Sequence, residues 1–159
     1  MRIFLTGFMG CGKTYLGKII AKKLNYKFID LDELIEKEQN LSINEIFEKK
    51  GEMFFRKLEN FFLQKTIKNF KNIVLATGGG TFCFFDNISI INKNGISFYI
   101  KTDVKTLIKR LQEEKNKRPL IKNKSKLEME IFIKKSLKLR EKFYLKSHFI
   151  FNEKFFNKK

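Results

Sequence analysis

The chain has 159 residues, of which 43% are apolar, so we expect a single domain, residues 1–159, with its own core. No run approaches the roughly 18 apolar residues of a membrane span, and the N-terminal apolar run is too short and glycine-broken for a signal peptide. The net charge is +17, but only five of the 34 basic residues are arginine. We interpret this as a general enrichment in lysine, which favours neither a nucleic-acid nor a membrane partner.

The first predicted elements are a short strand and a phosphate-binding loop. Apolar Ile3–Leu5 runs into Gly7–Thr14, which fits the pattern G-x-x-x-x-G-K-[ST] at every fixed position. Glycines let backbone N–H groups surround phosphate oxygens, and the next helix adds its N-terminal dipole. We expect Lys13 to reach the β- and γ-phosphates of ATP and Thr14 to offer its hydroxyl to Mg²⁺. The ATP-binding residues expected here are Gly10, Cys11, Gly12, Lys13 and Thr14.

A helix and a second strand follow the loop. Apolar residues at helical spacing predict a helix with one core-facing stripe, formed by Leu16, Ile19, Ile20 and Leu24. Lys27–Ile29 is a predicted strand, and Asp30 and Asp32 lie at its carboxyl end. Because ligands bind beyond the carboxyl ends of strands in open parallel sheets, we expect both carboxylates to face the bound phosphates.

Two helices come next. The segment Ser42–Glu45 is a capping box, so a helix begins at about residue 43, and it stops at Gly51. Residues 52–70 are predicted to form a longer helix, whose buried side is expected to carry Phe54, Leu58, Phe61 and Phe62. Arg56 and Glu59 of this helix are three residues apart and can meet on one face.

The next predicted strand, Ile73–Ala76, ends in three successive glycines, Gly78–Gly80. Glycines at the carboxyl end of a strand permit a backbone to approach a ligand closely, although a plain loop is the alternative. A helix near residues 86–92, a strand at 96–100 and an amphipathic helix from Asp103 follow. Strands that alternate with helices after a P-loop predict a three-layer α/β fold around a parallel sheet.

The pattern lapses at about residues 112–126, where the segment is polar, highly charged and holds the only proline, Pro119. We interpret this segment as a mobile lid. A last helix is predicted at about 127–144 and a last strand at 148–151. The single histidine, His148, is interpreted as structural, because no nucleophile or metal-ligand spacing surrounds it. The two cysteines, Cys11 and Cys83, form no metal or redox pattern, which indicates reduced thiols in the cytoplasm.

Arginine is scarce in this lysine-rich chain, so its positions carry information. The planar guanidinium binds a carboxylate or phosphate through two parallel bonds, which lysine cannot reproduce. On this ground we interpret Arg56, Arg118 and Arg140 as functional, and give less weight to Arg110. The alternative is ordinary use of arginine on helix surfaces.

Seven motifs, in this order, resemble those of the shikimate kinase family: Gly7–Thr14, Asp30–Asp32, Ser42–Phe47, Gly51–Glu59, Ala76–Gly80, Arg118–Leu120 and Arg140–Tyr144. The similarity spans residues 2–151. It implies a P-loop kinase fold with five parallel strands in the order 2-3-1-4-5, helices on both faces and a mobile lid. It also implies the transfer of a phosphoryl group from ATP to the 3-hydroxyl of shikimate, a step of aromatic amino-acid synthesis, by a monomer that uses Mg²⁺.

The resemblance further implies roles for single residues. Asp32 would bind the shikimate hydroxyls, including the acceptor, as a base or only as an orienting group. Arg56, held by Glu59, and Arg140 would bind the carboxylate of shikimate, and Arg118 would close onto the phosphates. The implied catalytic residues are Lys13, Asp32 and Arg118. The implied metal-site residues are Thr14 and Asp30. The implied acceptor pocket comprises Asp32, Arg56, Gly78, Gly79, Gly80 and Arg140.

Two departures from the family and two rival functions remain. The segment Arg140–Tyr144 lacks the proline that is common there, and only residues 152–159 follow the last predicted strand. Family members commonly carry an adenine-contacting loop and a closing helix at that place, so weaker ATP binding is expected.

The rivals are a P-loop kinase for another small acceptor, such as gluconate or a nucleoside monophosphate, and a non-enzymatic P-loop protein that binds nucleic acid. The arginine pair favours an acceptor with a carboxylate.

Overall fold

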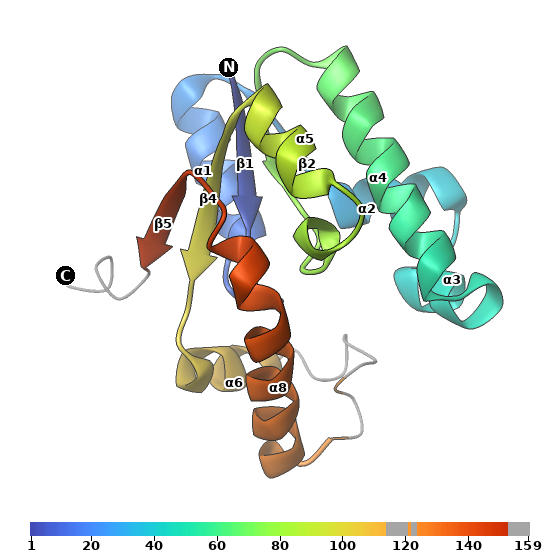
Figure 1. The fold of residues 1–159 in the computed structure, drawn as a ribbon, viewed down its shortest axis with the longest axis vertical. Helices are drawn as coiled ribbons and strands as arrows, with labels where there is room; N and C mark the ends of the chain where they lie inside the picture. Colours follow the sequence, from blue (N-terminus) through green and yellow to red (C-terminus); the bar gives the residue numbers. More distant parts are fainter. Residues whose placement is uncertain (114–120, 122–123, 153–159) are drawn as a thin grey trace.

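The computed structural model describes residues 1–113, 121 and 124–152, and the five strands of this part form one parallel sheet in the order β2-β3-β1-β4-β5 (Figure 1). The strands are β1 (Arg2–Thr6), β2 (Lys27–Asp30), β3 (Ile73–Ala76), β4 (Ile96–Lys101) and β5 (Phe149–Asn152). The predicted strand order is confirmed, and each strand lies within one residue of its predicted bounds at either end.

Both faces of the sheet are buried, which explains why its strands are continuous apolar runs. In β1, Phe4 faces one core cluster, whereas Ile3 and Leu5 face the other. Helices α4 (Glu52–Asn69) and α5 (Asn87–Asn94) lie in front of the sheet in Figure 1, and α1 (Lys13–Leu24) lies behind it. The sheet is therefore the middle of three layers, as the sequence predicts.

Helix α1 packs on the sheet through small residues. Its buried residues are Gly17 and Ala21, whereas Ile19 and Leu24 of the predicted core-facing stripe are 38% and 40% exposed. The prediction was wrong at these two positions because the small residues Gly17 and Ala21 form the line of contact with the sheet, whereas Leu16 and Ile20 pack beside it as predicted. A Cβ atom built on Gly17 would lie only 2.4 Å from Cε2 of Phe28.

Helix α2 (Leu31–Gln39) was not predicted from the sequence. Asp30 is its N-cap, because the Asp30 carboxylate accepts a hydrogen bond from the backbone N–H of Asp32 at 3.1 Å. The buried residues Leu31 and Ile35 recur at helical spacing and could have indicated this helix together with the capping aspartate. Asp32 therefore lies in the first turn of a helix and not in an extended segment.

The next two helices have the predicted bounds, but one has a different buried face. Helix α3 (Ile43–Lys50) begins at the capping box and ends at Gly51. In α4, Phe54 and Phe61 are 39% and 57% exposed, so their predicted burial was wrong. The buried side of α4 includes Phe55, Arg56, Glu59, Phe62 and Leu63. Two charged residues occupy it, so a prediction from apolar spacing alone was correct for Leu58 and Phe62 and wrong for the other two positions.

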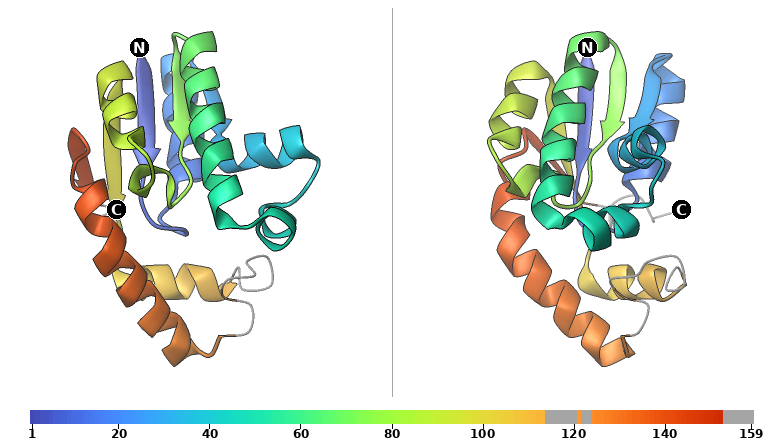
Figure 2. Two further views of the ribbon diagram at one scale, coloured as in Figure 1. Left: turned by 45° about the vertical axis from the view of Figure 1, so that its right-hand side comes forward. Right: turned by 90° about the vertical axis from the view of Figure 1, so that its right-hand side faces the viewer.

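The C-terminal helices lie beyond the carboxyl ends of the strands (Figure 2). The buried Leu107 and Leu111 of α6 (Val104–Glu113) belong to one apolar cluster with Met129 and Ile133 of α8 (Lys126–Tyr144). Ile121 is also fully buried in this cluster. Most of the predicted lid, including Arg118 and Pro119, lies outside the described residues, so the lid stays a prediction.

His148 lies just before β5 and contacts Ser97 of β4. The Nδ1 atom of His148 accepts a hydrogen bond from the Ser97 backbone N–H at 3.3 Å, and the backbone N–H of His148 donates to the Ser97 hydroxyl at 3.0 Å. These bonds join the starts of two neighbouring strands, in agreement with a structural role.

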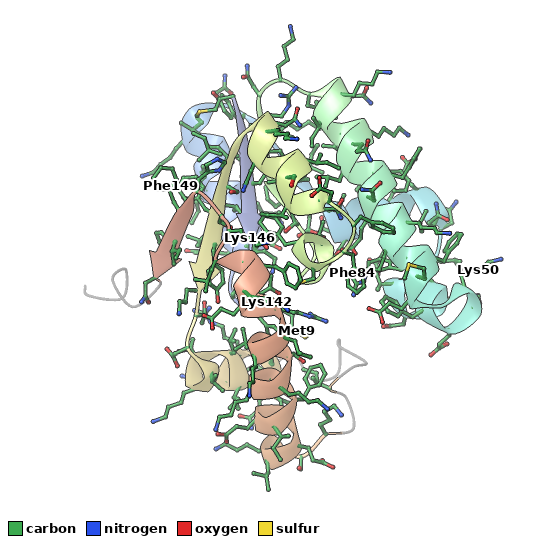
Figure 3. The ribbon with its side chains drawn as sticks, viewed as in Figure 1. Met9, Lys50, Phe84, Lys142, Lys146 and Phe149 are labelled. Carbon is green, nitrogen blue, oxygen red and sulfur yellow. The ribbon has the colours of Figure 1, made fainter. Side chains whose placement is uncertain are left out.

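Lysine side chains are spread over separate parts of the surface. Lys50 lies at the end of α3, whereas Lys142 and Lys146 lie near the end of α8 (Figure 3). Among the helices that the structure describes, none combines the length and the apolar character that crossing a membrane would require.

Candidate active site

The phosphate-binding loop joins β1 to α1 and is shaped by its glycines. The backbone φ angle is +144° at Gly7, +78° at Gly10 and +95° at Gly12, a region that side chains other than glycine rarely adopt. A Cβ atom on Gly7 would also lie 2.7 Å from the carbonyl oxygen of Ile100. Gly12 is the N-cap of α1 and has no side chain with which to cap the first N–H groups of that helix. These groups can therefore bind an anion.

Lys13 lies at the first position of α1 and points back into the loop. Its Nζ donates to the carbonyl oxygens of Gly7 at 2.9 Å and Phe8 at 3.1 Å. Cys11 is 1% exposed and packs beneath the loop in the apolar cluster of α1 and α6. This burial fits the interpretation of Cys11 as a small side chain that fills space.

Thr14, the second residue of α1, contacts Asp30, the last residue of β2. The Thr14 hydroxyl donates to Oδ2 of Asp30 at 2.7 Å. In the described part of the chain, no group of three or more histidine, cysteine, aspartate or glutamate side chains is arranged to hold a metal ion. A metal at Thr14 would therefore take most of its ligands from phosphates and water, which is the usual way in which proteins bind Mg²⁺.

Asp32 projects from the first turn of α2 into the cavity that the phosphate-binding loop also lines. Its Oδ1 atom is buried and has no hydrogen-bond partner among the described residues. Burial raises the pKa of Asp32 to about 7, and the nearby carboxylates of Glu59 and Asp30 add to this rise. The positive charges of Lys13 and Arg56 oppose it. At neutral pH this carboxyl group can therefore accept a proton or a hydrogen bond.

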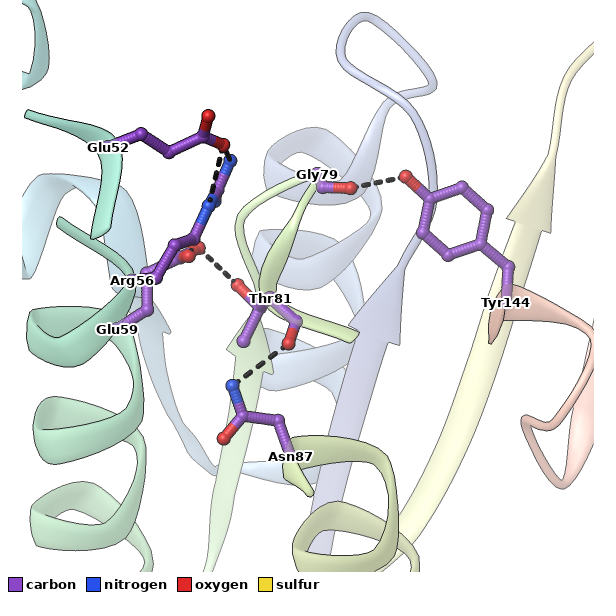
Figure 4. Close-up of polar contacts among 7 residues, drawn as sticks. All are labelled: Glu52, Arg56, Glu59, Gly79, Thr81, Asn87 and Tyr144. Carbon is purple, nitrogen blue, oxygen red and sulfur yellow. Dashed lines mark hydrogen bonds and ion pairs between the residues drawn. The ribbon is translucent and has the colours of Figure 1, made fainter. Parts of the chain in front are cut away.

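Arg56 is held rigidly on α4 by two glutamates (Figure 4). Its Nη1 pairs with Oε2 of Glu59 at 2.6 Å, and its Nη2 pairs with Oε1 of Glu52 at 2.9 Å. The Thr81 hydroxyl donates to the other oxygen of Glu59 at 2.6 Å. The guanidinium carbon also lies 4.4 Å from the ring centre of Phe84. The predicted contact between Arg56 and Glu59 is confirmed, and the contacts with Glu52 and Thr81 were not foreseen.

The glycines after β3 lie close to charged side chains, and a Cβ atom on Gly78 would lie only 2.5 Å from Oε1 of Glu59. A Cβ atom built on Gly78 would lie 2.7 Å from Oδ1 of Asp32, and one on Gly80 would lie 2.5 Å from Nη1 of Arg56. A Cβ atom on Gly79 would lie 3.8 Å from Nη1 of Arg140, an ordinary contact. The lack of a side chain at Gly78 and Gly80 thus leaves room for the charged groups of Asp32 and Arg56 close to the backbone.

One cavity of about 1070 Å³ brings most of the predicted site residues together. Its lining includes Gly10, Gly12, Lys13, Thr14, Asp30, Asp32, Arg56, Glu59, Gly78, Gly79, Gly80 and Arg140. Cys11 lies below the loop and outside this lining, and Arg118 lies outside the described residues. Arg110, which we considered a weaker candidate, also lines the cavity and donates from Nη1 to the Gly10 carbonyl oxygen at 3.3 Å.

Taken together, the strand order, the loop after β1 and the acidic and basic groups across the cavity define a P-loop phosphotransferase of the small-molecule kinase type. Within that class the chain belongs to the shikimate kinase family, whose family model matches residues 9–158. The resemblance found in the sequence is thereby confirmed.

Curated relatives and solved structures agree with this family. The chain is 47% identical to the shikimate kinase of Azobacteroides pseudotrichonymphae, over 83% of this chain and 78% of the relative. It is 44% identical to the enzyme of Flavobacterium psychrophilum, over 84% and 78% of the two chains. The crystal structure of shikimate kinase from Bacteroides thetaiotaomicron superposes with a TM-score of 0.93 at 42% identity, covering 96% of this chain and 86% of the other.

Two further structures differ in what they show. Shikimate kinase from Acinetobacter baumannii, solved in complex with shikimate, has a TM-score of 0.86 at 34% identity and covers 94% of this chain and 82% of its own. Deoxyadenosine kinase from M. mycoides has a TM-score of 0.61 at only 19% identity, covering 97% of this chain and 92% of its own. The second likeness concerns the fold alone.

Proposed function

We propose that this protein is a shikimate kinase, which transfers the γ-phosphoryl group of ATP to the 3-hydroxyl of shikimate and releases ADP and shikimate 3-phosphate in aromatic amino-acid biosynthesis. The observation that carries the proposal is one cavity in which Arg56, Arg140 and Asp32 lie beside a P-loop. Two guanidinium groups suit a carboxylate, and a carboxyl group beside them suits a hydroxyl acceptor. The A. baumannii relative solved with shikimate supports the same acceptor.

At the acceptor end, we assign Arg56 and Arg140 to the carboxylate of shikimate and Asp32 to its hydroxyls. Glu59 and Glu52 hold Arg56 in place, so that this side chain loses little freedom when it binds. The backbone of Gly78, Gly79 and Gly80 completes this side of the pocket. With its pKa at about 7, Asp32 can accept the proton that the attacking hydroxyl loses.

At the phosphate end, we assign the backbone of Gly10, Cys11 and Gly12 and the ammonium of Lys13 to the phosphates of ATP. Phosphoryl transfer depends mainly on positioning and on neutralising the charge of the transferring group. Mg²⁺ would supply part of this positive charge when bound, and we assign it to the Thr14 hydroxyl with Asp30 next to it. The hydrogen bond between Thr14 and Asp30 fixes the orientation of that hydroxyl.

From the sequence we also propose a lid, a cellular location and an assembly state. Arg118 closes onto the phosphates from a lid at about residues 112–126, and the protein acts as a cytoplasmic monomer of one domain without a nucleic-acid partner. Lid closure would also keep water from the phosphoryl group.

The decisive experiment is a coupled assay of ADP release with purified protein, ATP and Mg²⁺. We expect release to depend on shikimate, while gluconate and nucleoside monophosphates give no turnover above the ATP-only rate. Turnover with one of those acceptors and none with shikimate would contradict the proposal.

The variant Arg140→Lys tests the carboxylate assignment. Lysine keeps the charge but loses the two-pronged geometry, so the KM for shikimate should rise roughly tenfold or more, which corresponds to the loss of one charge-assisted hydrogen bond. The KM for ATP should change by less than about twofold. Equal rises in both constants would count against a role for Arg140 at the carboxylate.

A further inference from the structure

Tyr144 is a fully buried side chain that touches the cavity wall from the outside. It lies at the last position of α8, and its hydroxyl donates a hydrogen bond to the carbonyl oxygen of Gly79 (Figure 4). Its ring packs on that of Tyr99, with the two ring centres 5.1 Å apart. Burial raises the pKa of Tyr144, so the hydroxyl keeps its proton and remains a donor across the physiological range.

The hydrogen bond from Tyr144 fixes the orientation of a peptide group in the cavity. A trans peptide is planar, so its C=O and the following N–H point in opposite directions. With the Gly79 carbonyl held toward α8, the N–H of Gly80 is directed to the other side, where Arg56 lies (Figure 4). Without a side chain, a glycine peptide has few other restraints on this orientation.

The same contact lies close to Arg140. Tyr144 and Arg140 are four residues apart on α8 and therefore lie on one face of that helix. The charge of Arg140 is close enough to lower the pKa of Tyr144 against the effect of burial, and Nη1 of Arg140 approaches Gly79. The first half of α8, in contrast, packs on α6 through Met129 and Ile133. The Tyr144 hydrogen bond thus connects the glycine loop directly to the turn of α8 that carries Arg140.

We propose that Tyr144 is a positioning residue for the acceptor: its hydroxyl holds the Gly79 carbonyl and so sets the place of Arg140 relative to the glycine loop. The inference rests on the proposed function, because it assumes that this pocket binds the carboxylate of shikimate. In this proposal Tyr144 does not contact the acceptor. It aligns Arg140 and the glycine loop, which do contact the acceptor.

The test is Tyr144→Phe, with Tyr99→Phe as the matched control. Tyr99 is the neighbouring buried tyrosine, and its hydroxyl instead approaches Oε1 of Glu141 at 3.4 Å. We expect Tyr144→Phe to raise the KM for shikimate about five- to tenfold, the effect of one lost hydrogen bond, with kcat and the KM for ATP within about twofold. Tyr99→Phe should leave all three constants within about twofold.

A double-mutant cycle separates positioning from general stability. Because Tyr144 acts through Arg140, Arg140→Lys should raise the KM for shikimate less in the Tyr144→Phe protein than in the parent. Independent, multiplying effects would overturn the inference. So would an unchanged KM for shikimate, equal rises in both KM values, or a Tyr144→Phe protein that does not fold. If the parent protein does not use shikimate at all, the proposed function fails first, and this inference fails with it.

Discussion

Two carboxyl groups and two cations of the cavity act on the ionisation of Asp32. Burial is the largest cause of its raised pKa, Glu59 and Asp30 add to it, and Lys13 and Arg56 act in the opposite direction. Because these effects oppose one another, a bound substrate or a change of pH can alter the ionisation state of Asp32. Two measurements follow, one of activity and one of stability.

The first prediction concerns the pH dependence of activity. If Asp32 must be ionised to accept the hydroxyl proton, kcat/KM for shikimate should fall below about pH 7, where the group becomes protonated. Asp32→Asn should lower kcat by about 100-fold or more, the usual contribution of a general base. Asp86→Asn, at an exposed carboxyl group outside the cavity, is the control and should keep the parent profile. A parent profile that is flat between about pH 5.5 and 8.5 would contradict this role.

The second prediction concerns stability. The pKa of Asp32 is about 7 in the folded chain and has its ordinary value of 3.8 in the unfolded chain, so the folded state binds more protons between these limits. The contribution of Asp32 to stability therefore falls as the pH rises from about 4 to 7. Asp32→Asn removes this cost, and its melting temperature should exceed that of the parent more at pH 8 than at pH 5. An equal difference at both pH values would refute the raised pKa.

At the scale of helices and strands, the sequence predicted what depends on local pattern. The strands, the capping box at Ser42 and the apolar stripe of α6 were all predicted correctly, because each is encoded by neighbouring residues. Helix α2 was missed, and the buried faces of α1 and α4 were partly wrong. The two buried faces depend on the closeness of the sheet and on the burial of Arg56 and Glu59, which only the assembled fold determines. Helix α2, in contrast, has a local signal in its capping aspartate and in the spacing of Leu31 and Ile35.

In the candidate site, too, the features that follow from local sequence pattern were predicted and those that depend on distant residues were not. The P-loop, the aspartates after β2 and the glycines after β3 were found because each follows a strand at the carboxyl edge of the sheet. The Tyr144 contact with Gly79 joins residues 65 positions apart, and no local pattern indicates it. Glu52 is different, since its spacing of four residues from Arg56 could have suggested their ion pair.

A third prediction tests the close approach of α1 to the sheet. Alanine favours helices by about 1 kcal/mol over glycine, but a Cβ at Gly17 would lie 2.4 Å from Phe28 and 3.2 Å from Leu5. We expect the steric term to prevail, so that Gly17→Ala lowers the free energy of unfolding by about 1–3 kcal/mol. Lys18→Ala, at the exposed neighbouring position, should change it by less than about 0.5 kcal/mol. Denaturant unfolding checks both, and a Gly17→Ala protein as stable as the parent would contradict the packing argument.

The net charge of the whole molecule is +17, and in the part of the chain that the structure describes lysines occur on separate elements, such as Lys50 at the end of α3 and Lys142 near the end of α8 (Figure 3). The arginines have a different distribution: Arg56, Arg110 and Arg140 all line the cavity. Net charge that is spread over a surface governs solubility and the approach of ions more than specific recognition.

The fourth prediction follows from this distribution. Scattered lysines give a weak, strongly salt-dependent attraction to DNA, so a gel-shift experiment should show no complex at about 150 mM salt with micromolar protein, even if a band forms at about 20 mM. A complex that persists at the higher salt concentration would support the nucleic-acid alternative. Adding ATP and shikimate should not change the result, because the cavity is separate from Lys50 and Lys146.

The order of the strands in the sheet also bears on how the protein is made. β1 is synthesised first but is central, and its partners are β3 at Ile73–Ala76 and β4 at Ile96–Lys101. At about 5–20 residues per second, a ribosome needs roughly 4 to 20 s to supply both neighbours. Until β3 is made, the apolar Ile3–Leu5 segment has neither of its partner strands, and until β4 is made one of its edges stays unpaired, so the nascent chain is open to association with other chains. The P-loop, the first motif translated, is thus among the last to gain its final surroundings.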